Sequence, residues 1–250
     1  MRGSPIRANR LSPLLVWLCV IVNFLGWTIG AQVAALTGPA GLGGEGLKSW
    51  QGVLTANLNH VLVAATCLWV ARVSFTAGWR GLGIGRQPIG SEIKYALAGW
   101  LAAIVVCGLM LLATDQVFTR LLPWFRPPDH SVFITLKDPA VTPLMRTIAI
   151  GGAFMLAPIG EELLFRGILQ TAIKKVIPRR WGSMRHRWVA IGVAALLFAV
   201  MHTATPHHMV ALAGLGVILG YLYERRGSLV VPILVHMLFN GKSLLWHELR

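Results

Sequence analysis

The chain contains long runs of apolar residues separated by short polar segments. Each run is close to the roughly 17–25 residues that cross a bilayer as a helix. Lipid offers no hydrogen bonds to the backbone, and the runs lack the alternation of a membrane barrel, so each is expected to be helical. The pattern predicts an all-α, polytopic membrane helix bundle with about seven transmembrane helices, at residues 13–36, 53–73, 93–114, 147–169, 188–204, 207–223 and 229–246.

Composition agrees with a membrane location for the whole chain. Of the 250 residues, 55% are hydrophobic and 13% are charged, and the mean hydropathy is +0.64. Soluble domains contain about 45–50% apolar and about 25% charged residues. We find neither an internal repeat nor a soluble domain, so residues 1–250 are expected to form a single membrane domain. The first apolar run exceeds the apolar core of a cleavable signal peptide and is interpreted as a retained anchor.

The positive charge gathers on one side of the predicted bundle. The chain has 23 Lys and Arg residues and a formal net charge of +14. Most of these residues lie in the N-terminal segment, which includes Arg2, Arg7 and Arg10, and in the second, fourth and sixth loops. The positive-inside rule therefore predicts a cytoplasmic N-terminus and a C-terminus outside. Topology and attraction to anionic lipid account for the charge, so the lipid bilayer is an expected partner and nucleic acid is not.

Two carboxylates and a guanidinium interrupt the fourth apolar run, as Glu161, Glu162 and Arg166. Charged groups at the middle of a transmembrane helix cost roughly 2.5–3.5 kcal/mol each on insertion scales, so a purely structural helix would not retain three. Glu162 and Arg166 are four residues apart, a spacing that predicts an ion pair. Glu161 has no such partner in its own helix, which suits it to act as a general base. The alternative is a structural ion pair with Glu161 as a bystander.

Two later runs carry histidines at matching spacings. Phe198 and His202 are four residues apart in the fifth run, and His236 and Asn240 are four apart in the seventh. A lone histidine in an apolar helix is more often a satisfied core residue than a catalytic one. His236 and Asn240, however, form a polar stripe on an otherwise apolar helix. Three such patterns on three long runs indicate a shared site.

These three patterns, Glu161-Glu162-x-x-x-Arg166, Phe198-x-x-x-His202 and His236-x-x-x-Asn240, resemble the ordered motifs of the CAAX-protease and bacteriocin-processing family, also called CPBP or Abi. The family includes endopeptidases that remove the last three residues of prenylated proteins. The resemblance covers residues 147–246, the expected catalytic core. It implies an intramembrane endopeptidase that hydrolyses a peptide bond of a membrane-associated peptide or protein.

The resemblance also implies roles for the motif residues. Glu161 would activate a water molecule that His202 helps to hold, and His236 with Asn240 would stabilise the oxyanion. The remaining motif residues, Glu162, Arg166 and Phe198, would support the site. Neither serine nor cysteine is paired with these groups, so an activated water is the simplest nucleophile.

A zinc-dependent version of the same peptidase is an open alternative. Glu161, His202 and His236 also form a plausible His₂Glu zinc set, although the HExxH signature of zinc proteases is absent. We favour a glutamate mechanism without a cofactor. The three cysteines, Cys19, Cys67 and Cys107, lie in different apolar runs and are expected to be core residues rather than a disulfide or zinc framework.

Depth in the membrane gives a further expectation. If the fifth helix entered the membrane at Trp188, His202 would lie roughly 22 Å from the inner boundary, far above Glu161 and His236. We therefore expect residues 187–192 to form a helical extension below the membrane, and the site to occupy a water-filled cavity open to the cytoplasm. His207 and His208 are expected at the start of the next helix rather than in the site.

Two other function classes compete with a peptidase. A non-catalytic immunity or interaction protein of the same family would retain the fold without activity. A proton-coupled transporter would also bury Glu and His, but it predicts inverted repeats that this sequence does not show. The short chain without soluble domains favours a prokaryotic plasma membrane. Substrate identity and oligomeric state are left open by the sequence.

Overall fold

The computed structural model describes residues 9–37, 50–85, 87–122, 124, 131–137, 139, 141–178, 180, 182–202 and 206–248. Within these residues the regular structure is helical. The helices are α1 (Pro13–Thr37), α2 (Trp50–Ser74), α3 (Ile89–Leu121), α4 (Ser131–Lys137), α5 (Pro143–Gly151), α6 (Ala157–Glu162), α7 (Thr171–Val176), α8 (Ser183–Val200), α9 (Met209–Arg226) and α10 (Val230–Glu248). The predicted all-α fold is confirmed. Arg2 and Arg7, part of the predicted positive N-terminal segment, lie outside the described residues.

The fourth predicted helix is continuous but irregular. Between α5 and α7, two stretches are π-helical, η3 (Gly152–Leu156) and η4 (Leu163–Gln170), and they flank α6. Pro158 explains the first, because it lacks an N–H and its ring would clash with the carbonyl one turn earlier. Single π-turns within helices are frequent at functional sites. The second stretch begins directly after Glu162, and the first ends where α6, which carries both glutamates, begins.

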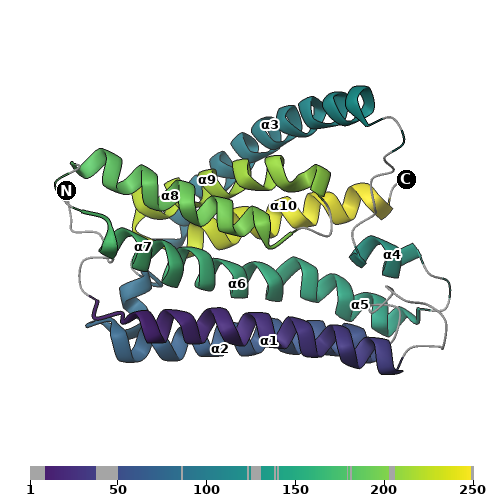
Figure 1. Ribbon diagram of the computed structural model, residues 1–250, viewed down its shortest axis with the longest axis horizontal. Coiled ribbons are helices and arrows are strands. Elements are labelled where there is room, and N and C mark those ends of the chain that lie inside the picture. The colour runs from purple at the N-terminus through teal and green to yellow at the C-terminus, as the bar shows by residue number, and fades with distance from the viewer. Residues whose placement is uncertain are drawn as a thin grey trace.

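The helices are arranged in three layers, and this irregular helix forms the middle one. Figure 1 shows the α1–α2 hairpin on one side of α6, and α8, α9 and α10 on the other, with α3 outermost. Helix α2 packs against α6, η3 and η4, while α8 packs against η4 and α10 packs against α6. The glutamate-bearing helix is therefore the central layer, and both neighbouring layers reach it.

Lipid-facing surface is visible on the outer helices. Along α3, the side chains of Leu101, Val105, Leu109 and Leu112 are 58–64% exposed and repeat every three or four residues. Exposed apolar stripes of this kind fit a bilayer better than water. Among the residues that the structure describes, four helical segments are long and apolar enough to cross a membrane: Gly52–Ser74, Ile89–Leu121, Pro143–Val176 and Ser183–Val200.

The seven predicted ranges overlap, in order, α1, α2, α3, the continuous helix from α5 to α7, α8, α9 and α10, with different ends. Among the described residues, 13–26 and 230–246 form apolar helices shorter than a full span. The helical membrane bundle is thus established, while the number of spans stays a prediction.

Glycines let the central helix approach α2. A Cβ atom at Gly152 would lie 1.8 Å from Oδ1 of Asn57, and one at Gly160 would lie 3.1 Å from the carbonyl oxygen of His60. Small residues commonly allow such close approach between membrane helices. Gly160 immediately precedes Glu161, so this contact fixes the glutamate relative to α2.

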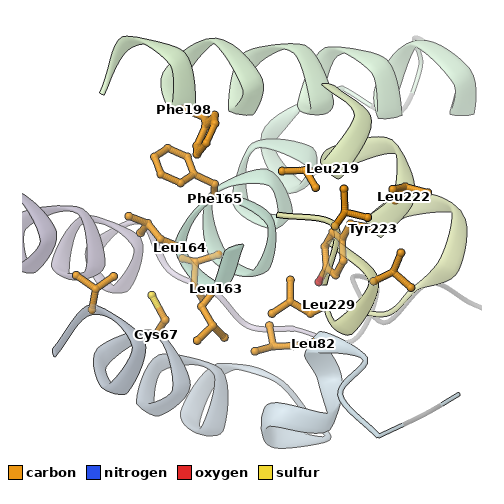
Figure 2. Packing of buried hydrophobic residues seen from close by; sticks show 14 of the residues in the cluster. Cys67, Leu82, Leu163, Leu164, Phe165, Phe198, Leu219, Leu222, Tyr223 and Leu229 are labelled. Carbon is orange, nitrogen blue, oxygen red and sulfur yellow. The ribbon is translucent and has the colours of Figure 1, made fainter. Parts of the chain in front are cut away.

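The core beneath the site is apolar and includes aromatic rings. Phe165 and Phe198 meet edge to face with their centroids 5.2 Å apart. Figure 2 shows both rings on one side of a cluster that continues through Leu163, Leu219 and Leu229. The cysteines Cys19, Cys67 and Cys107 are buried and unoxidised, as expected of core residues.

The fifth predicted helix begins earlier and ends earlier than expected. Helix α8 starts at Ser183, so residues 187–192 are helical as predicted, but it ends at Val200. His202 therefore lies in the turn after the helix and not within it. His207 and His208 precede the first residue of α9, as expected.

Candidate active site

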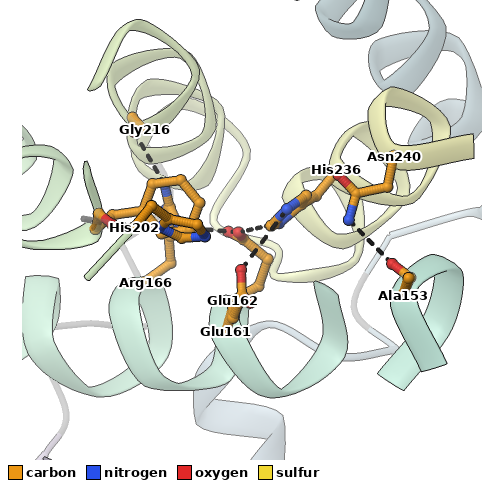
Figure 3. Close-up of polar contacts among 9 residues, drawn as sticks. Ala153, Glu161, Glu162, Arg166, His202, Gly216, His236 and Asn240 are labelled. Carbon is orange, nitrogen blue, oxygen red and sulfur yellow. Dashed lines mark hydrogen bonds and ion pairs between the residues drawn. The ribbon is translucent and has the colours of Figure 1, made fainter. Parts of the chain in front are cut away.

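Three separate parts of the fold bring the motif residues together. Helix α6 supplies Glu161 and Glu162, and the turn after α8 supplies His202. Helix α10 supplies His236. Figure 3 shows the two glutamates reaching from the central helix toward His202 on one side and His236 on the other. Glu161 is 41 residues from His202 and 75 residues from His236 in sequence. The tertiary fold therefore brings them into one site.

A buried ion pair forms the base of the site. Nη1 of Arg166 donates to Oε1 of Glu162 at 2.8 Å, and both side chains are at most 1% exposed. The predicted i,i+4 ion pair is therefore present. Nη2 of Arg166 also donates to the carbonyl oxygen of Gly216 in α9, at 3.2 Å. Removing either partner would leave an unpaired charge away from water, which is strongly unfavourable.

The same glutamate orients His236. Nδ1 of His236 lies 2.9 Å from Oε1 of Glu162. A carboxylate only accepts hydrogen bonds, so the His236 proton is assigned to Nδ1 and Nε2 faces away from Glu162. Nε2 lies 3.7 Å from Oε2 of Glu161, too long for a direct hydrogen bond. A bridging water could link two groups at such a distance.

His202 is held by the last turn of the preceding helix, α8. Its Nδ1 lies 2.8 Å from the carbonyl oxygen of Phe198, and a carbonyl can only accept, so Nδ1 carries the hydrogen in the neutral ring. The Phe198 ring is fully buried. Its centroid lies 4.8 Å from the centroid of the His202 ring and 5.7 Å from that of the His236 ring. The Arg166 guanidinium lies 4.8 Å from the same ring centroid. Phe198 thus packs against three of the polar groups at once.

Asn240 lies one turn beyond His236 and bonds to the backbone. Its Nδ2 donates to the carbonyl oxygen of Ala153 at 3.0 Å, within the π-helical stretch η3. The amide has two hydrogens. The bond to Ala153 therefore fixes the amide plane while using only one of them.

Glu161 interacts with ionisable side chains from other helices as well as from its own. Its side chain is 22% exposed, and its charge interacts with His236, His202, His60 and Arg166. The expectation of a carboxylate without adjacent cationic groups holds only within α6. Tertiary packing surrounds the carboxylate with imidazoles from three helices or their ends.

His60 on α2 was missed in the sequence. It interacts electrostatically with Glu161 and with His236. An ionisable residue inside a transmembrane helix is a functional candidate by default, and His60 lies within the second apolar run. Its position in an apolar run was therefore a signal in the sequence. Unlike His236, however, it has no polar residue four positions away.

A row of polar contacts continues from Arg166 toward the other end of α9. Gln170 donates through Nε2 to the carbonyl oxygen of Gly220 at 3.2 Å and to Glu224 at 3.4 Å. Glu224 also pairs with Lys174. Sequence reasoning missed this row, although its members on the central helix repeat every four residues. The contacts hold α9 against the helix that carries the site.

Zinc ligands of the right type are present, but not in a metal-binding arrangement. Imidazole nitrogens and a carboxylate are ordinary zinc donors. Within the part of the chain that the structure describes, no three His, Cys, Asp or Glu side chains are placed to hold one ion. The bonds of Nδ1 in His236 to Glu162 and in His202 to backbone leave each Nε2 available, as in many metal-bound histidines, so they do not argue against a metal. Only the placement of the side chains in the described residues does.

The fold and the site together define a membrane helix bundle with a buried glutamate, arginine and histidine cluster. Residues 143–241 match a protein family described as type II CAAX prenyl endopeptidase Rce1-like. An Escherichia coli protein named "uncharacterized 24.3 kDa protein" is 30% identical over 169 residues, covering 65% of this chain and 70% of its own. The UPF0177 protein YxdF of Lactococcus lactis is 27% identical over 93 residues, covering 36% of this chain and 46% of its own.

No solved structure matches the chain at a comparable level of significance. The chain belongs to the Rce1-like group of the CAAX-protease and bacteriocin-processing family. Membership supports the general function of a CAAX-type intramembrane protease in an integral membrane protein.

Proposed function

We propose that this chain is an intramembrane endopeptidase in which Glu161 activates the attacking water. The observation that supports this most is the position of Glu161, whose carboxylate oxygen lies 3.7 Å from Nε2 of an oriented histidine, His236. The buried Arg166–Glu162 pair fixes that histidine. A base, an orienting carboxylate and a second histidine therefore converge on one small volume.

The reaction follows from these positions. A water held by Glu161 and His202 gives a proton to the Glu161 carboxylate as its oxygen attacks the carbonyl carbon of the peptide. The tetrahedral intermediate then breaks its C–N bond, and Glu161 passes the proton to the leaving amine. The products are a carboxylic acid and an amine, which exchange a proton to become a carboxylate and an ammonium group, so the atoms balance without any other reactant.

His236 and Asn240 are the proposed oxyanion donors. Because Nδ1 of His236 keeps its proton for Glu162, donation from Nε2 requires the imidazolium form. The Glu162 carboxylate at Nδ1 and the developing oxyanion at Nε2 compensate that charge. The hydrogen of Asn240 that Ala153 does not engage is the second donor. Removing one donor of this type typically costs about 10²–10³ in kcat.

We propose that hydrolysis proceeds without a metal. Purified protein should contain well under one equivalent of zinc by elemental analysis, and cleavage should persist in excess chelator. The measurement pairs metal content with activity on the same sample. One tightly bound zinc per chain, together with loss of activity on its removal and recovery on its return, would contradict the proposal.

The proposed substrate is a membrane-associated peptide or protein that reaches the site from the cytoplasmic side of a prokaryotic plasma membrane. The proposed topology has a cytoplasmic N-terminus. Lys174 and Glu224 lie toward the end of the bundle where α7 and α9 end (Figure 1), which is the predicted cytoplasmic end. In this proposal the lipid bilayer surrounds the helices and also holds the substrate near the site.

Comparing peptides in cells tests the function and identifies the substrate. Membrane fractions from cells with the wild-type chain and with Glu161→Gln would be compared by mass spectrometry. The proposal predicts an uncut precursor that accumulates only with the variant, and a fragment that appears only with the wild type. Identical peptide profiles would favour a non-catalytic immunity or interaction protein.

A further inference from the structure

Helix α2 carries three polar residues near the central helix, and two of them have structural contacts. Nδ2 of Asn57 donates to the carbonyl oxygen of Ile148 at 3.3 Å, which ties α2 to α5. Asn59 is 4% exposed and faces α1 at Gly26, where a Cβ would lie 1.9 Å from its Oδ1. Asn57 therefore links two helices by a hydrogen bond, and Asn59 packs closely against α1. The third, His60, has different neighbours.

His60 lies where α2 touches the glutamate-bearing helix. A Cβ on Gly160 would be 3.1 Å from the carbonyl oxygen of His60 and 3.7 Å from its Cα. The next residue in α6 is Glu161. The backbones of α2 and α6 therefore meet directly beside the proposed base, with His60 at the contact.

The helix that carries His60 lies on the side of the central helix opposite to α8 and α10, the layer to which His202 and His236 belong (Figure 1). The half-buried His60 interacts electrostatically with Glu161 and with His236. The other ionisable groups that interact with Glu161 are His236, His202 and Arg166, and Glu162 is its neighbour in α6.

We propose that His60 is a positioning residue of this site, which holds the Glu161 carboxylate from the α2 side. The proposal rests on the proposed role of Glu161 as base. An imidazole N–H or imidazolium beside a carboxylate favours the ionised form and limits its rotation. Without the His60 imidazole, this position on α2 would offer Glu161 no polar side chain, so the anion that accepts a proton from water would be less stabilised.

Labelling by a hydrophobic carbodiimide tests this without a substrate. Dicyclohexylcarbodiimide reacts with protonated carboxyl groups in apolar surroundings, and mass spectrometry of the purified full chain in liposomes gives the rate at Glu161. His60→Leu should label Glu161 about three- to tenfold faster than wild type. His60→Gln keeps a hydrogen-bond donor and should stay close to the wild-type rate. Glu92, buried in α3 away from the site, is the internal reference.

Asn57→Leu is the matched control, because Asn57 lies one turn earlier on the same helix and bonds only to backbone in α5 among its described contacts. It should lower the thermal unfolding temperature and leave the labelling rate of Glu161 unchanged. Equal rates in wild type and His60→Leu would overturn the proposal. So would an equal acceleration by Asn57→Leu, since loosening of α2 would then explain both.

The labelling result is independent of proteolysis. If Glu161→Gln retains full cleavage, the proposed function fails whatever the labelling shows. If Glu161→Gln abolishes cleavage while His60→Leu changes neither labelling nor kcat, only the role of His60 is wrong.

Discussion

Replacing Glu161 by glutamine should lower kcat by about 10²–10⁴, because glutamine keeps the size and hydrogen bonding of the side chain but cannot accept the proton from water. The side chain is 22% exposed and packs among imidazoles that tolerate a neutral amide. The fold should therefore survive. The measurement is single-turnover cleavage, by protein in proteoliposomes, of the peptide identified by the cellular comparison.

Asp115→Asn is the control for this substitution. Asp115 is an exposed carboxylate on α3, outside the site, and its loss removes the same charge. Its kcat should equal that of the wild type. Cleavage by Glu161→Gln within a factor of about three of wild type would rule out Glu161 as the base, since general-base catalysis contributes far more.

Replacing Arg166 by leucine should destabilise the protein by about 3–5 kcal/mol, the usual cost of leaving one partner of a buried ion pair alone. Glu162 is 0% exposed and would retain only the hydrogen bond from His236. The link to Gly216 in α9 would be lost as well. Thermal or denaturant unfolding in detergent, followed by circular dichroism, measures the change.

The double variant Glu162→Gln/Arg166→Leu separates charge from packing. Removing both charges should restore a large part of the lost stability, because the desolvation cost disappears with the pair. Glutamine can still accept from Nδ1 of His236. The exposed Arg185 provides the matched control, and Arg185→Leu should change stability by less than about 0.5 kcal/mol. Equal losses for Arg166→Leu and Arg185→Leu would contradict the buried pair.

The motif geometry was predictable wherever it depended on one helix. The spacing of Glu162 and Arg166 was enough to predict their ion pair, because residues four apart always share a helix face. Apolar run length likewise predicted each helix, because a bilayer sets both its minimum length and its backbone hydrogen bonding. These are local consequences of sequence, so they needed no tertiary information.

Contacts between layers could not be predicted in the same way. The bond from Glu162 to His236 joins α6 to α10, and nothing in either motif specifies which carboxylate the histidine meets. His60 went unnoticed because its significance depends on Gly160, whose missing Cβ lets α2 approach α6. The exact end of α8, which leaves His202 in a turn, was hidden by a hydrophobic run that continues past the helix.

The most direct test of the central claim, that Glu161 activates a water rather than attacking the peptide itself, is a single-turnover cleavage in H₂¹⁸O. Mass spectrometry then reads the isotope in the new carboxylate of the product. Water attack predicts one ¹⁸O atom in that carboxylate from the first turnover. A first-turnover product containing only ¹⁶O would mean that an oxygen of the protein was transferred, and that result, or no cleavage at all, would contradict the account.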